Sequence, residues 1–296
     1  MPELPEVETV RRGLERTVVG KTVQSVEIVA AKIFPVSWDA LDELLIGASV
    51  ARVERRAKVL LITLSNQWTL AIHLKMTGQI IVVSPKPEVG GFVGGHPEAA
   101  YAEPLPHKHT HVTIQFTDGT MLYFNDLRKF GWMKLLAPEP TTGYVDRDSF
   151  LSSLRLGPEP LSEEFTLDYL RGVLRNRSTV VKSLLLDQAA IAGIGNIYAD
   201  EALFLANVRP TRRAKTLTRK EQEKLYAAIR TVLTLGIEHG GTSMNTYVNV
   251  EGTAGRMRDH LRVYGREGEP CFVCGAPIER KKIGQRSSHY CLTCQR

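Results

Sequence analysis

The residues that directly follow Met1 are suited to covalent chemistry. Removal of Met1, which a small second residue permits, would leave Pro2 with a free secondary amine beside the carboxylate of Glu3. An α-amino group titrates at ~8, against ~10.4 for lysine, so far more of it is unprotonated at neutral pH. Such an amine can attack a carbonyl-like carbon and form a Schiff base, with the acid moving protons. A helix start, where proline and acids are favoured, explains the same residues.

The four cysteines indicate a metal site. Cys271 and Cys274 form one C-x2-C pair, and Cys291 and Cys294 form a second, with sixteen residues between the two pairs. Two such pairs can surround one zinc ion tetrahedrally. Two disulfides are the alternative, but we see no secretory signal and no further cysteine, which favours zinc. Four thiolates leave no open coordination position, so we expect one structural zinc ion per chain.

Composition and charge point to a protein of about two domains that binds a polyanion. The chain has 296 residues, is 43% hydrophobic and 24% charged, and carries a net charge of +6. No apolar run reaches the ~18 residues of a membrane span. The positive charge is concentrated at residues 209–230, with a net of +6, and at residues 255–296, with a net of +5. Basic segments beside a zinc hairpin favour nucleic acid as the partner.

The first half of the chain predicts a helix followed by an antiparallel sandwich or barrel. Apolar residues at helical spacing predict an amphipathic helix over residues 5–18: Leu4, Val7, Val10, Leu14 and Val18. Strand-like runs follow at Val23–Val29, Ser49–Arg55, Val59–Leu64, Thr69–Leu74, Gln79–Val83, His111–Phe116, Met121–Asn125 and Trp132–Leu136. The stretch 85–106, rich in proline and glycine, is expected to be a long loop.

The second half predicts helices. Proline and glycine in residues 137–160 are typical of a linker, and helical patterns cover about 163–175, 178–187, 196–206 and 218–239. Between two of these helices lies Gly193-Ile194-Gly195-Asn196, with Asn196 expected at the N-cap. Backbone N–H groups at a helix start can hold a phosphate, and the nearby Arg177 and Lys182 favour that role.

These features together resemble the formamidopyrimidine-DNA glycosylase family, bacterial base-excision-repair enzymes for oxidised purines, over essentially the whole chain. The matching motifs are Pro2-Glu3-Leu4-Pro5-Glu6-Val7-Glu8, Arg55-Arg56-Ala57-Lys58, His73-Leu74-Lys75-Met76-Thr77-Gly78, Asp126-Leu127-Arg128-Lys129-Phe130-Gly131, Gly193-Ile194-Gly195-Asn196-Ile197-Tyr198-Ala199, and the four-cysteine finger with Gln285-Arg286. With the finger in the same chain, the resemblance favours Pro2 as a nucleophile over a mere helix start.

The resemblance implies a multidomain α+β fold. An N-terminal antiparallel β-sandwich with a leading helix would cover residues 1–137, followed by a linker at 138–160. A helix–two-turn–helix DNA-binding domain would cover 161–261, and a zinc-ribbon-type finger 262–296. The implied partner is damaged double-stranded DNA. We expect a monomeric protein of the bacterial cytoplasm, associated with the nucleoid when bound to DNA, that needs no small-molecule cofactor and no membrane.

The resemblance also implies roles for individual residues. Pro2 would attack C1′ of the damaged nucleotide, Glu3 would assist base loss, Lys58 would assist β-elimination, and Arg286 would assist δ-elimination. Other positions match the family's DNA contacts: His109, Arg128, Arg177, Lys182 and Asn196. Met76, Arg128 and Phe130 match the residues that fill the gap left by a flipped base. Residues 242–255 match the lid over that base.

Several of these residues have simpler explanations, and the chain departs from the family pattern in two places. Lys58 could be an exposed strand-end lysine, Met76 and Phe130 could belong to the core, and Arg286 could be a surface charge. His107, His109 and His111 alternate, as on one strand face, where a second metal is a weaker possibility than a phosphate contact by His109. The loop 85–106 is longer than usual for the family, and the order of lid residues 241–246 differs.

Two other functions stay open. The related endonuclease VIII branch prefers oxidised pyrimidines, but it usually begins Pro-Glu-Gly-Pro and lacks the Arg128-x-Phe130 pair seen here. A zinc-finger DNA-binding protein without activity is the second alternative, against which Pro2, Glu3 and Lys58 argue.

Overall fold

The structure, a computed structural model, describes residues 1–85, 91–95, 103–242 and 257–296. It divides the chain into two compact units. One comprises Met1–Leu154 with His239–Arg256, and the other comprises Arg155–Glu238 with Met257–Arg296. Of the expected lid at 242–255, all residues after Thr242 lie outside the described part of the chain.

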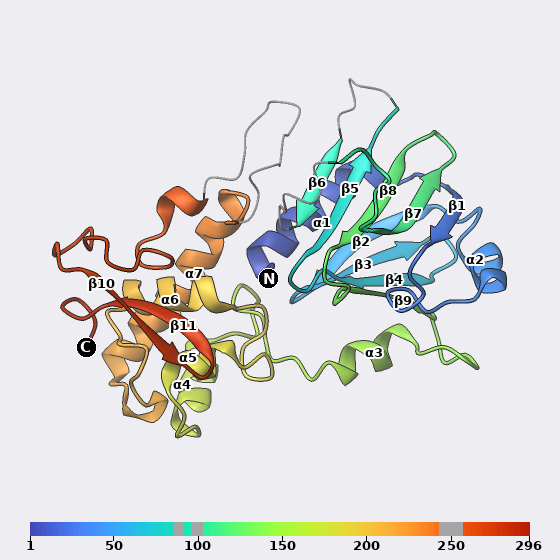
Figure 1. Cartoon of the computed structure of the whole chain (residues 1–296). Helices are drawn as coiled ribbons and strands as arrows, with labels where there is room; N and C mark the ends of the chain where they lie inside the picture. The colour runs from blue at the N-terminus through green and yellow to red at the C-terminus, as the bar shows by residue number, and fades with distance from the viewer. Residues whose placement is uncertain (86–90, 96–102, 243–256) are drawn as a thin grey trace. The chain divides into compact units, whose positions relative to one another are not determined.

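The first unit is a sandwich of two antiparallel sheets with one helix leading into it (Figure 1). One sheet has the order β1-β7-β8-β5-β6, and the other has the order β2-β3-β4-β9. The strands span β1 (Val23–Ile28), β2 (Val50–Arg56), β3 (Val59–Leu64), β4 (Thr69–His73), β5 (Gly78–Val83), β6 (Phe92–Gly95), β7 (Thr110–Phe116), β8 (Met121–Asp126) and β9 (Trp132–Leu136). The expected antiparallel sandwich is thereby confirmed.

Strand β3 shows why the segment after the sandwich is not a plain linker. All six β3 residues are buried, so both faces of the strand are covered. Leu60 and Ile62 face the core between the sheets, whereas Val59 and Leu61 pack with Phe150 on the outside. Phe150 belongs to α3 (Arg147–Ser153), a helix within the segment expected to be a linker. The α3 helix thus supplies Phe150, which covers the apolar outer face of β3.

The stretch 85–106 contains a strand, contrary to the expectation of a loop. Strand β6 pairs with β5, and Phe92 packs beside the leading helix α1 (Leu4–Val18). A Cβ atom on Gly13 of α1 would lie only 2.1 Å from the Phe92 ring, so the ring occupies the space above that glycine. A second short helix that sequence reasoning missed is α2 (Trp38–Leu44), whose N-cap is Ser37.

The second unit is helical and carries the finger. Its helices are α4 (Leu167–Arg175), α5 (Val181–Leu186), α6 (Asn196–Leu205) and α7 (Arg219–Glu238), close to the predicted ranges. They share one core around Tyr198, Leu203 and Ile229. The finger ends in a hairpin of β10 (Ile278–Ile283) and β11 (Arg286–Cys291). Its own small core joins Phe204 of α6 to Val263, Ile278 and two of the cysteines.

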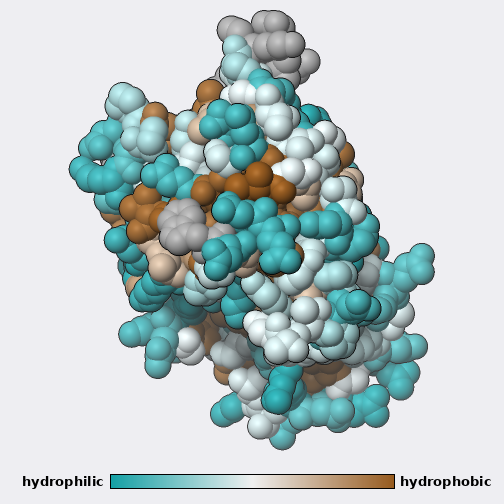
Figure 2. Space-filling model, turned by 90° about the vertical axis from the view of Figure 1, so that its right-hand side faces the viewer, coloured by the Kyte–Doolittle hydropathy of each residue, from teal (hydrophilic) through white to brown (hydrophobic). Residues whose placement is uncertain are grey.

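The surface has polar and apolar parts. Figure 2 shows one face of the molecule, on which hydrophilic residues predominate and hydrophobic residues gather in patches. Among the described residues, none of the helices combines the length and apolar character needed to cross a membrane. The large hydrophobic side chains that the structure leaves exposed include Met76 and Phe130, two of the predicted site residues.

Candidate functional site

The predicted nucleophile and its acid lie at the start of α1. Glu3 is the N-cap of the helix, Pro5 lies in its first turn, and Pro2 is buried. Glu3 is only 3% exposed, so its carboxyl group is largely removed from water. A helix start and a catalytic pair are therefore compatible at these positions, because Pro2 and Glu3 precede Leu4, the first helical residue.

The sequence analysis assigned no role to Glu6. In the structure, its side chain connects the start of α1 to a distant segment of the same unit. One of its carboxylate oxygens accepts the backbone N–H of Glu3 at 2.9 Å. The other accepts the backbone N–H of Thr242 at 2.8 Å and the Thr242 hydroxyl at 3.1 Å. Gly241 has a φ of +79°, and a Cβ there would lie 2.8 Å from Glu6, so only glycine fits.

Lys58 lies in the turn between β2 and β3, as expected, and is only 6% exposed. Arg55 links this turn to α1, since its side chain donates to Glu8 at 3.1 Å and to the Ala57 carbonyl at 3.0 Å. Burial alone would raise the pKa of Glu8, but hydrogen bonds from Arg11, Arg12 and Arg55 outweigh it and lower that pKa. An ionised Glu8 therefore holds the residues just before Lys58 beside α1.

His73 is a neutral base near Lys58. Burial, then the charges of Lys75 and Lys58, lower the pKa of His73 from 6.5 to about 3. Its Nδ1 accepts the backbone N–H of Lys75 at 2.9 Å. That contact supports Lys75, whose φ is +52°, at the turn that leads to Met76. His73 thus shapes the loop that presents Met76.

The three residues expected to fill the gap behind a flipped base form one exposed cluster. An Arg128 Nη1 group donates to the Met76 sulfur at 3.1 Å. The Arg128 guanidinium also lies 4.5 Å from the centroid of the Phe130 ring. Met76 is 39% exposed and Phe130 is 51% exposed, so neither belongs to the core. We call Met76, Arg128 and Phe130 the wedge cluster.

A buried carboxylate supports the wedge cluster from below. Asp126 is fully buried at the end of β8, and its carboxylate accepts the Thr77 hydroxyl. It also accepts the backbone N–H groups of Arg128 at 3.1 Å and Gly131 at 2.6 Å. Because Thr77 follows Met76, one carboxylate joins the two loops that carry the cluster.

The three histidines do not share a strand face. His111 lies in β7, where its Nε2 contacts the Asp126 carbonyl oxygen at 2.8 Å. His107 and His109 lie in the turn before β7, with ring centroids 5.9 Å apart. The His109 carbonyl accepts the Asp126 N–H at 3.0 Å, which places the His109 turn next to the wedge loops. In the part of the chain that the structure describes, these histidines form no candidate metal group.

The glycine-rich motif of the second unit opens α6. Gly195 is the N-cap and Asn196 the first helical residue, which corrects the expected N-cap position of Asn196. The Asn196 side-chain amide donates to the Ser287 carbonyl of β11 at 3.0 Å. Arg177 is 51% exposed, with Asp187 at 3.5 Å, and so presents a charge at the surface of this unit.

Lys182 differs from the expectation that it touches phosphate. Its side chain is fully buried, and its ammonium lies 2.7 Å from Asp200 and donates to the Ser287 carbonyl at 2.8 Å. The charge of Lys182 is therefore used inside the unit. The sequence could not show this, because Asp200 lies on another helix.

Arg286 lies directly after the hairpin turn of the finger. Gly284 and Gln285 form that two-residue turn with φ values of 52° and 65°, as a type I′ turn requires. Arg286 pairs with Ile283 across the turn and is exposed. A short, rigid turn thus presents one arginine at the end of the hairpin.

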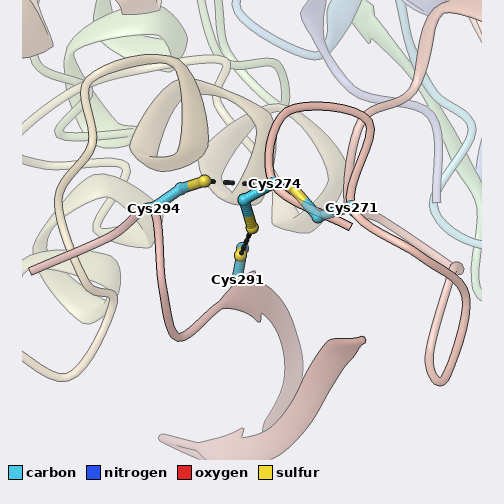
Figure 3. A group of neighbouring side chains, drawn as sticks. All are labelled: Cys271, Cys274, Cys291 and Cys294. Atoms are coloured by element: carbon cyan, nitrogen blue, oxygen red, sulfur yellow. Dashed lines mark hydrogen bonds between the residues drawn. The ribbon is translucent and has the colours of Figure 1, made fainter. Parts of the chain in front are cut away.

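The four cysteines form one cluster in which the sulfur atoms point toward one another (Figure 3). All four sulfurs lie within 4.8 Å of one another, with 3.9 Å between Cys271 and Cys294 and 3.4 Å between Cys274 and Cys291. A tetrahedral zinc ion with bonds of about 2.3 Å needs sulfur separations of roughly 3.8 Å. The residues therefore fit one structural zinc ion.

Comparison with known proteins agrees with this arrangement. The model of the formamidopyrimidine-DNA glycosylase N-terminal domain matches residues 1–133, the H2TH domain of the same family matches 156–248, and the zinc finger found in FPG and IleRS matches 268–296. The formamidopyrimidine-DNA glycosylases of Herpetosiphon aurantiacus and Pelotomaculum thermopropionicum are each 43% identical to the chain. Both matches cover 100% of this chain. They cover 100% of the H. aurantiacus protein and 99% of the P. thermopropionicum protein.

Solved structures give the same result. A Lactococcus lactis FPG mutant in complex with Fapy-dG-containing DNA is 34% identical, with a TM-score of 0.83 and full coverage of both chains. The L. lactis Fpg complex with abasic-site DNA is 33% identical, with a TM-score of 0.83 and 99% coverage of both chains. With matches along its whole length, the chain belongs to the formamidopyrimidine-DNA glycosylase family.

Proposed function

We propose that this protein removes oxidised purines, namely 8-oxoguanine and formamidopyrimidines, from double-stranded DNA and then cleaves the strand at the resulting abasic site. The observation that carries the proposal is the exposed wedge cluster on the unit that also holds Pro2, Glu3 and Lys58. Relatives solved with Fapy-dG or abasic DNA support the substrate.

The wedge cluster suits base flipping. A base in the duplex is out of reach of an enzyme, so it must be turned out at a cost of a few kcal/mol. Side chains inserted between bases offset that cost. Met76 and Phe130 offer apolar surface for this, and Arg128 offers hydrogen-bond donors to the base left without a partner.

The N-terminal residues suit the chemical steps. After loss of Met1, the Pro2 nitrogen attacks C1′, and the C1′–N bond to the base and the C1′–O4′ ring bond break, with Glu3 supplying a proton to the ring oxygen or the departing base. The resulting iminium is a cation that acidifies the C2′ proton, whose removal breaks the C3′–O bond in β-elimination. Loss of a C4′ proton then breaks the C5′–O bond in δ-elimination. Lys58 serves the first elimination and Arg286 the second.

The remaining parts hold DNA. Asn196 at the start of α6, Arg177, His109 and Arg128 contact phosphates or bases, and basic contacts make the affinity salt-dependent. One zinc ion, held by the four cysteines, maintains the finger. The protein acts as a monomer in the cytoplasm, where it meets the nucleoid, and uses no small-molecule cofactor.

Borohydride trapping on defined duplexes tests the proposal. The purified protein, incubated with a duplex that holds one 8-oxoguanine opposite cytosine, should form a covalent adduct that maps to the N-terminal peptide. A variant that retains Met1 should form none. An adduct on Lys58 or another lysine would refute the role of Pro2. A preference for oxidised pyrimidines would instead support an endonuclease VIII-like enzyme, and binding without cleavage would support a non-catalytic zinc-finger protein.

A further inference from the structure

The Ser287 carbonyl oxygen, next to Arg286 in β11, accepts two side-chain hydrogen bonds. One comes from Lys182 of α5 at 2.8 Å, and the other comes from Asn196 of α6 at 3.0 Å. The hairpin turn also lies against α5, because a Cβ on Gly284 would be 3.0 Å from the Ser183 hydroxyl. The backbone beside Arg286 is therefore held by the two helices that flank the glycine-rich motif.

Asp200 of α6 completes this attachment. It is 1% exposed, and its carboxylate accepts the Ser288 hydroxyl and the His289 backbone N–H, both at 2.9 Å. Its third partner is the Lys182 ammonium at 2.7 Å. One carboxylate thus binds the hairpin at two residues and also holds the lysine that binds a third, Ser287.

The network contains a fully buried ion pair, Lys182–Asp200. A fully buried ion pair costs desolvation that its attraction barely repays, so it is a poor means of adding stability. Such a pair is directional, however, and both of its residues are hydrogen-bonded to the strand that begins with Arg286: Lys182 donates to it, and Asp200 accepts from it. Hydrogen bonds to charged groups are short and restrict geometry more than apolar packing does. The arrangement suits the fixing of a functional side chain better than the filling of a core.

We propose that Asp200 is a positioning residue for Arg286, and that the Lys182–Asp200 pair sets the place of the hairpin end relative to Asn196. This inference rests on the proposed function, in which Arg286 serves δ-elimination. Asp200 is 1% exposed, so we assign it no contact with DNA or with the reacting atoms. Its loss should therefore change the balance between δ- and β-elimination products without abolishing the first strand cut.

The neighbouring residue Glu201 provides a matched control. It is 3% exposed on the same helix and accepts the backbone N–H groups of Arg262, Val263 and Tyr264 at 2.8 to 2.9 Å. Glu201 therefore holds the start of the finger, whereas Asp200 holds the hairpin. If attachment of the finger in general decided the product ratio, a change at either residue would lower it. If the place of Arg286 decides the ratio, only a change at Asp200 should lower it.

The experiment uses the zinc-loaded full chain on a duplex with a preformed abasic site. Products with a 3′-phosphate, from δ-elimination, are compared with 3′-unsaturated aldehydes, from β-elimination, under single-turnover conditions. Asp200→Asn should lower the δ-to-β ratio about tenfold, the effect of one charge-assisted hydrogen bond, while zinc content stays at one ion. Glu201→Gln should leave the ratio unchanged. Ser288→Ala removes a hydrogen bond to Asp200 but no charge, so it should lower the δ-to-β ratio less. This variant replaces Asp200→Asn in the experiment if Asp200→Asn does not fold.

Arg286→Ala distinguishes a failure of this inference from a failure of the proposed function. If this variant keeps the wild-type ratio, the role of Arg286 in the proposed function is wrong, and the inference falls with it. If Arg286→Ala lowers the ratio but Asp200→Asn and Ser288→Ala do not, the inference alone is overturned. Equal effects of Asp200→Asn and Glu201→Gln would also overturn it, because they would show general loosening of the finger.

Discussion

Glu6 and Thr242 are 236 residues apart and joined by two hydrogen bonds, from the Thr242 backbone N–H and its hydroxyl to one Glu6 carboxylate oxygen. The other oxygen accepts the N–H of Glu3. The buried side chain of Glu6 thus links Glu3, the proposed catalytic acid, to Thr242, the first residue of the expected lid. Glutamate suits the position because both of its oxygens accept.

Glu6→Gln should weaken both protein stability and covalent trapping. Glutamine has the same shape, but its NH2 group must face either the Glu3 N–H or the Thr242 N–H, and a buried donor without an acceptor costs about 1–3 kcal/mol. The measurements are thermal unfolding and borohydride trapping on an abasic duplex. Thr242→Val, which keeps the backbone contact, should have the smaller effect on both. A Glu6→Gln protein with wild-type Tm and trapping would contradict this role.

Much of this arrangement was visible in the sequence. Short strand-like runs predicted eight strands close to their observed bounds, and the cysteine spacing predicted the cluster. Strand β6 was missed because it is short and ends in Gly94 and Gly95, which disfavour strands, so it depends on pairing with β5 and on space above Gly13. The α2 helix was missed although Ser37 is a typical N-cap and Leu41 and Leu45 follow at helical spacing.

The sequence allowed the site residues to be named, but it did not reveal the side chains that surround and support them. Met76, Arg128 and Phe130 were named from the family resemblance, and the structure brings them together in one cluster. No local pattern reveals that the carboxylates of Glu6, Asp126 and Asp200 have distant partners. These partners are Thr242, Thr77 and Ser288, respectively, and each lies at least 49 residues away along the chain. Long-range contacts of this kind also explain why Lys182 was predicted to contact phosphate, since Ser287 lies 105 residues away along the chain.

His73 should make the protein less stable in acid. Its pKa is about 3 in the folded chain, against 6.5 ordinarily, so below about pH 6.5 the unfolded chain binds a proton that the folded chain does not. Stability should therefore fall as the pH drops from 6.5 toward 3. His73→Asn, whose Oδ1 can replace Nδ1 as acceptor for Lys75, should show a smaller loss between pH 7 and pH 4.5 in urea unfolding.

Two NMR titrations check the cause. The His73 ring signals should not titrate between pH 5 and 8, unlike those of an exposed histidine. Lys58→Met removes one of the charges that lower the pKa of His73, so the titration should move to higher pH in that variant. A His73 that titrates near 6.5 in the unmodified protein would contradict the environment described.

Loss of one zinc ligand should disrupt the finger and leave the sandwich folded. Cys291→Ser replaces a thiolate with a weak ligand, so metal analysis should find less than one zinc ion per chain. DNA binding should weaken, since Arg286 loses its hairpin support, while the sandwich keeps its far-UV circular dichroism. Protein purified under reducing conditions that contains no zinc at all, even without substitution, would refute the metal site.

Arg128 should read the base opposite the lesion. Once the damaged nucleotide is turned out, cytosine presents O2 and N3 as acceptors, which a guanidinium with only donors can bind. Adenine places an amino donor on the same edge. Because 8-oxoguanine arises opposite cytosine, this contact would favour repair before misreplication. Opposite adenine, removal of the lesion would instead fix a mutation.

Single-turnover excision of 8-oxoguanine should therefore be much faster opposite cytosine than opposite adenine. A bidentate contact gives about 1–3 kcal/mol of discrimination, so Arg128→Ala should lower the rate ratio between the two contexts by about tenfold or more. Arg128→Lys is the control, because it keeps the charge but not the planar fork, and it should lose most of the discrimination with less loss of binding. Met76 and Phe130 remain in both variants and should still support some flipping. If Arg128→Ala keeps the wild-type ratio, the cluster acts as a wedge alone and another residue reads the opposite base.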